Sequence, residues 1–160
     1  ILGAAKIDSL LSQILDRFFL PTLNGNNDEL LEGDSPLSTF SSRINICYRL
    51  GIISSSFAKS LHLVRKIRNS FAHEVTGVKI DTGSHADRIK SLLLPMNSLN
   101  FYSDFRKAFF GEKSISNDFK TCLAMMTGRL ESILQDITPV INLDNEFILE
   151  EWKTLDLAKK

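Results

Sequence analysis

The sequence has only two cysteines, no long apolar run and no excess of charge of either sign. Cys47 and Cys122 each lie among apolar residues at helical spacing, which indicates core side chains in a reducing compartment and not a disulfide framework. No apolar run approaches the roughly 20 residues that a membrane-spanning helix needs. Basic and acidic residues number 19 each, whereas DNA-binding modules commonly carry a basic excess. These absences predict a cytoplasmic protein that does not contact a membrane and for which direct DNA binding is doubtful.

Familiar catalytic and metal-binding motifs are also missing. The chain contains no GxGxxG or Walker loop, no HExxH, no GxSxG and no cysteine pair at metal-ligand spacing. His62 and His73 lie on one expected helix but about 16 Å apart, too far to share a zinc ion. His85 follows a helix start and is expected at the surface. The sequence therefore predicts no metal and no cofactor.

Helical periodicity is what the chain does contain. It predicts an all-α, single-domain bundle of about five to seven helices over residues 1–140, followed by a tail, 141–160, that could be a docking helix. Proline, glycine and capping residues place the expected ends of these helices. The expected helices are 1–20, a short 28–31, one after Pro36 that Gly51 closes, one from Phe57 to about His73, 85–94, 101–110 and 118–137.

The helix that begins near Phe57 has the strongest amphipathic pattern. One side of its helical wheel is apolar: Phe57, Leu61, Val64, Ile67, Phe71. The opposite stripe is polar: His62, Lys66, Asn69, His73. We expect this helix to be central and to organise the core. Because Arg68 falls on its apolar side, Arg68 should be paired or should line a cleft, since burying an isolated charge costs several kcal/mol.

Arg68, Asn69 and His73 are the best candidates for chemistry. Histidine can serve as a general acid or base, and arginine can stabilise the charge that develops on phosphate oxygens, so the set suits metal-independent cleavage of RNA. Asn69 would orient the imidazole or hold a phosphate, while Arg65 and Lys66 would bind and steer the RNA. Arg68 and His73 lie about 140° apart on a straight helix, so they would meet only at a helix end, at a bend or across two protomers. Alternatively, Arg68 is structural and ties neighbouring helices together, and His73 is favoured by the helix dipole.

The segment from Arg68 to His73 resembles the motif of the HEPN superfamily: an arginine, a polar residue, a short spacer and a histidine. This resemblance implies a helical-bundle domain, in many members dimeric. The superfamily includes toxin and defence ribonucleases as well as non-catalytic members.

Three segments in order also resemble the mannitol operon repressor-like family. They are residues 36–44, 48–53 and 63–73. The resemblance implies an all-helical bundle with a bacterial regulatory role. The pair of helices around Gly51 would also fit a helix-turn-helix, but the broad apolar face of the second helix is typical of a core element and not of a helix that reads DNA.

Three functions follow as hypotheses. The first is a non-enzymatic regulatory or interaction domain for transcription regulation, acting through a protein partner and forming a homodimer. The alternative is a HEPN-type endoribonuclease with RNA as substrate. A repressor that binds DNA directly is the weakest of the three hypotheses, because the chain has no net positive charge.

Overall fold

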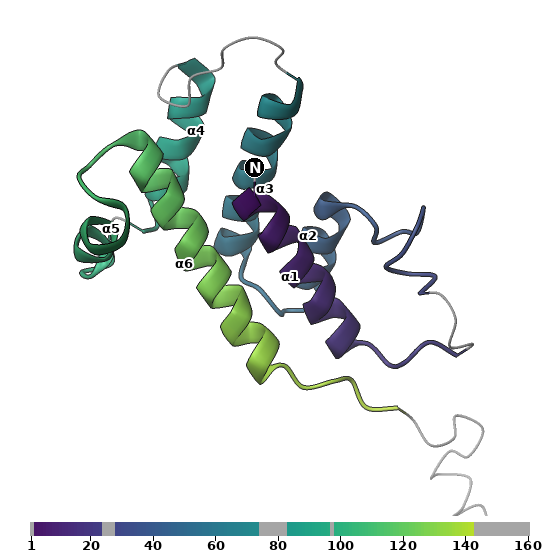
Figure 1. Cartoon of the computed structure of the whole chain (residues 1–160). Coiled ribbons are helices and arrows are strands. Elements are labelled where there is room, and N and C mark those ends of the chain that lie inside the picture. The colour runs from purple at the N-terminus through teal and green to yellow at the C-terminus, as the bar shows by residue number, and fades with distance from the viewer. Residues whose placement is uncertain (1, 24–27, 74–82, 97, 143–160) are drawn as a thin grey trace, which may run out of the picture.

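Six α-helices and no strand make up the part of the chain that the computed structural model describes, residues 2–23, 28–73, 83–96 and 98–142 (Figure 1). The helices are α1 (Leu2–Phe18), α2 (Phe40–Arg49), α3 (Ser55–His73), α4 (Gly83–Leu93), α5 (Tyr102–Phe110) and α6 (Ile115–Asp136). The prediction of an all-α, single-domain bundle is confirmed. The expected docking helix in the tail falls almost entirely outside the described residues, as does the predicted loop after His73.

Side-chain caps set several helix starts as the sequence indicates. Thr39 caps α2 in a reciprocal capping box with Ser42. The Ser54 hydroxyl accepts the backbone N–H of Phe57 at 3.2 Å at the start of α3. Ser114 caps α6, which therefore begins at Ile115, three residues before the predicted start. These caps satisfy backbone N–H groups that have no partner within the helix.

The segment from Asp28 differs from its prediction. The Asp28 carboxylate accepts the backbone N–H groups of Leu30 and Leu31 at 2.8 and 3.0 Å, as a capping residue does. The chain nevertheless makes only turns there and no helix. Arg43 on α2 holds this segment, because it donates to the Leu31 carbonyl at 3.4 Å while it pairs with Asp8 of α1 at 2.9 Å.

The most extensive helix pairing joins the first and the last helix of the chain, α1 and α6, which Figure 1 shows side by side. α6 also packs against α4 and α5, whereas α3 packs against α1, α2 and α4. The predicted apolar side of α3 is confirmed: Leu61, Val64 and Ile67 are buried, and Phe57 and Phe71 are partly buried against the core. The largest contact in the bundle is nevertheless that of α1 with α6, so α3 shares the core with these two helices.

Both cysteines are buried in this core as free thiols, as predicted. Burial raises the pKa of Cys47 and of Cys122 to about 12. Within the described residues, no helix combines the length and the hydropathy needed to cross a membrane.

Candidate functional site

The residues predicted to carry chemistry lie in the C-terminal half of α3, which packs against α4. Figure 1 shows these two helices standing next to each other at one end of the bundle. The helical register places successive residues of the motif on different sides of α3. The residues of the motif therefore do not share one face of α3.

Ser70 and Phe71, in the middle of the motif, pack against α4. The Ser70 hydroxyl accepts a hydrogen bond from Arg88 Nη1 at 2.6 Å and donates to the Lys66 carbonyl at 2.9 Å. The Phe71 ring stacks on the His85 ring with 4.7 Å between centroids. Part of the motif thus holds α3 and α4 together.

His85 corrects a prediction, because it is only 5% exposed and not a surface residue. It lies one turn before Ile89 and two turns before Leu92, both fully buried, so its position in the helical repeat could have placed it on the inner face of α4. The aromatic ring of Phe71 covers it.

Arg68 and Asn69 are both half-buried. Neither side chain forms a hydrogen bond or an ion pair with another residue in the described ranges. The predicted tie from Arg68 to neighbouring helices therefore stays a prediction. Lys66 is exposed, whereas Arg65 is half-buried and its Nε is enclosed by protein atoms. His73 is the last residue of α3, and its predicted approach to Arg68 also stays a prediction.

His62, on the polar stripe of α3, has a structural contact. Its Nε2 lies 3.0 Å from the Asn45 Oδ1, which joins α3 to α2. Because an amide oxygen only accepts, Nε2 carries the proton in this arrangement. Burial, followed by the positive charges of Arg65 and Lys66, lowers the pKa of His62 below its ordinary value. The lowered pKa favours the neutral imidazole, which can still donate its Nε2 proton to Asn45.

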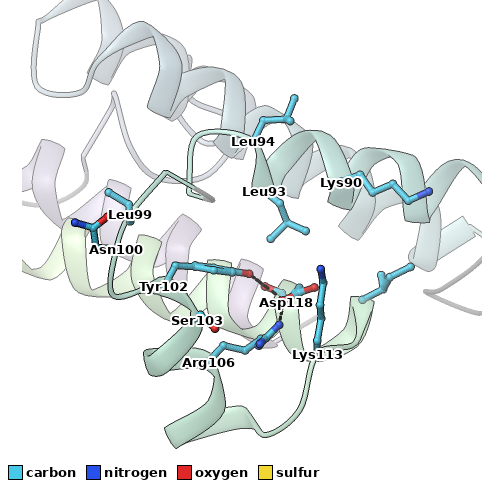
Figure 2. Close-up of a pocket in the computed structure, with 11 residues that line it drawn as sticks. Lys90, Leu93, Leu94, Leu99, Asn100, Tyr102, Ser103, Arg106, Lys113 and Asp118 are labelled. Atoms are coloured by element: carbon cyan, nitrogen blue, oxygen red, sulfur yellow. Dashed lines mark hydrogen bonds and ion pairs between the residues drawn. The ribbon is translucent and has the colours of Figure 1, made fainter.

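A buried polar cluster between α5 and α6 was not anticipated from the sequence. Arg106 Nη1 donates to Asp118 Oδ1 at 3.2 Å, and the Tyr102 hydroxyl donates to the same oxygen at 3.2 Å (Figure 2). All three residues are at most 8% exposed. Tyr102 and Arg106 are one helical turn apart on α5, which places them on one face, but this spacing alone does not distinguish that face from the one that carries the phenylalanines.

This cluster also determines which face of α5 turns inward. The phenylalanines of α5 and of its start also recur at helical spacing, but Phe101 and Phe109 are 55% and 69% exposed. α5 instead buries Tyr102 and Arg106. The ion pair with Asp118 offsets the cost of burying the guanidinium, so a polar face can turn inward.

Among the described residues, no three or more histidine, cysteine, aspartate or glutamate side chains gather so that they could hold a metal ion. Comparisons of the chain with protein-family models, with curated proteins and with solved structures give no match. The resemblance to the mannitol operon repressor-like family and to the HEPN superfamily therefore rests on the sequence segments alone.

Proposed function

We propose that the chain is a non-enzymatic regulatory or interaction domain that acts through a protein partner. The observation that supports this proposal is the exposure of large aromatic side chains on α5 and at its start. Phe101 and Phe109 are 55% and 69% exposed, and the Phe109 ring lies against the Phe105 ring in a tilted arrangement with 4.7 Å between centroids. Aromatic side chains are enriched at protein interfaces, and exposed apolar patches mark interaction sites. A second copy of the chain would be one such partner, and a bacterial regulator another.

The test is a double variant that removes this apolar surface, Phe101→Ser with Phe109→Ser. We expect wild-type protein to retain a specific partner from a lysate of the source cell, or to form dimers in sedimentation velocity, and the double variant to lose that association. Loss of central aromatic contacts typically weakens binding by about 2 kcal/mol or more, roughly 30-fold.

The matched control is Leu2→Ser with Leu23→Ser, because both leucines are more than four-fifths exposed and lie away from α5. The control should keep the association. If both double variants bind as wild type does, or if wild type neither dimerises nor retains a partner, α5 is not the interaction surface.

A ribonuclease is the second candidate, and a specific observation favours it. The side chains of Arg68 and Asn69 have no hydrogen-bond or ion-pair partner among the described residues, and Lys66 is exposed beside them. An arginine that is not used by the fold is available to a phosphate. His73, on the following turn of α3, would supply the acid or base.

Incubation of the purified protein with structured and single-stranded RNA in EDTA tests this candidate. A ribonuclease should cleave, and His73→Ala and Arg68→Ala should each reduce the rate by about 100-fold or more. Lys59→Ala, at an exposed position on the same helix, should cleave as wild type does. Intact RNA with the wild-type protein excludes the ribonuclease and leaves the interaction domain.

A further inference from the structure

A pocket of about 730 Å³ lies where α4, α5 and α6 meet, with the buried polar cluster in its wall (Figure 2). Its apolar lining comes from Leu93, Leu94, Leu99 and Ile115. The volume falls in the range of pockets that bind small molecules, which are commonly apolar with a few placed polar groups. The site lies apart from the motif on α3.

The charged groups of the pocket are mainly positive. Lys90, Arg106 and Lys113 line it together with one carboxylate, Asp118, which leaves an excess of two positive charges. Lys90 also pairs with Asp87 at 3.5 Å, but both side chains are more than two-thirds exposed, so water screens this pair. Lys113 forms no ion pair with any residue in the described ranges.

Arg106 is held in the wall of the pocket, and its hydrogen-bond donors are only partly used there. Its side chain is 10% exposed, and among the described residues only Nη1 of its five N–H donors is engaged, in the ion pair with Asp118. The Nε atom is buried and has no hydrogen-bond partner among the described residues. The Asp118 oxygen that pairs with Arg106 also accepts a hydrogen bond from the Tyr102 hydroxyl. A rigid, buried cation with spare donors favours an anion beside it.

We propose that this pocket binds a small organic anion with an apolar body. The carboxylate, phosphate or sulfonate group of the ligand lies beside Arg106 and Lys113, and Lys90 adds positive charge at the rim of the pocket (Figure 2). Its apolar body lies against Leu93, Leu99 and Ile115. This inference is independent of the proposed function, since it uses neither the motif on α3 nor the exposed phenylalanines.

Two fluorescent probes that share their aromatic rings and differ by one sulfonate group test the proposal. Anilinonaphthalene sulfonate carries the anion and the apolar body, whereas phenylnaphthylamine has the same rings without the sulfonate. We expect wild-type protein to bind the sulfonate more tightly than the neutral probe. Lys90→Gln with Lys113→Gln should weaken sulfonate binding about fivefold and leave the affinity for the neutral probe unchanged.

The matched control is Lys107→Gln with Lys120→Gln, because both lysines are exposed and neither lines the pocket. This control should bind the sulfonate as wild type does, and 1 M salt should weaken sulfonate binding to wild type by screening. Three results would overturn the proposal: no binding of the sulfonate, equal binding of the two probes, or equal loss in both lysine pairs. Melting temperatures of both double variants should match wild type, since all four positions are solvent-facing charges.

Discussion

Replacement of Arg106 by alanine is expected to lower the free energy of unfolding by about 3–5 kcal/mol. The substitution removes the guanidinium that pairs with Asp118 at 3.2 Å. The carboxylate of Asp118, which is 5% exposed in the wild-type fold, then keeps only the Tyr102 hydroxyl as a side-chain partner among the described residues. A buried charge without its partner is among the most costly changes a fold can suffer. Urea unfolding followed by circular dichroism measures the loss.

Two further variants isolate the cause of this loss. Asp118→Ala in the Arg106→Ala background should recover part of the stability, with a coupling energy of about 0.5–3 kcal/mol, because no charge is then left unpaired. Arg68→Ala should change the free energy of unfolding by less than about 1 kcal/mol, since Arg68 is half-buried and has no described side-chain partner. A larger loss at Arg68 than at Arg106 would reverse this assignment of the structural arginine.

The helices and much of the core could be predicted because their signals are local. The capping hydroxyls of Thr39 and Ser54 and the positive φ of Gly51 act within a few residues along the chain. The apolar repeat of α3 identifies which side of the helix is buried. None of these features requires knowledge of a neighbouring helix.

Tertiary contacts decided the features that the sequence did not predict. The repeat of phenylalanines in α5 is as regular as the pair Tyr102 and Arg106, and only the distant Asp118 makes the polar face the buried one. The dominant pairing of α1 with α6 likewise joins segments from opposite ends of the chain. Periodicity indicates that a face is buried but not which element covers it.

The candidate site also combines features that local sequence predicts with features that only tertiary contacts decide. A motif of neighbouring residues on α3 is visible in the sequence. The contacts of Ser70 with Arg88 and of Phe71 with His85 depend instead on how α4 packs against α3. The pocket draws its cations from α4, α5 and the link before α6, so no single segment of sequence could indicate it.

Replacement of Leu11 by alanine should cost about 2–5 kcal/mol of stability, because Leu11 is fully buried on α1 and its removal leaves a cavity. Urea unfolding again measures the change. Leu2→Ala on the same helix is the matched control: Leu2 is 88% exposed, and its replacement should stay within about 0.5 kcal/mol of wild type. A loss below about 1 kcal/mol at Leu11 would contradict the close packing of this core.

The same variant separates stability from ligand binding. Leu11 lies on α1 and does not line the pocket between α4, α5 and α6. Below its unfolding transition, Leu11→Ala should therefore bind anilinonaphthalene sulfonate as wild type does, even though it is far less stable. The lysine pair Lys90→Gln with Lys113→Gln should show the opposite behaviour, with normal stability and weakened binding. If probe binding instead followed stability across both variants, the probe would be reporting loosened packing and not an anion site.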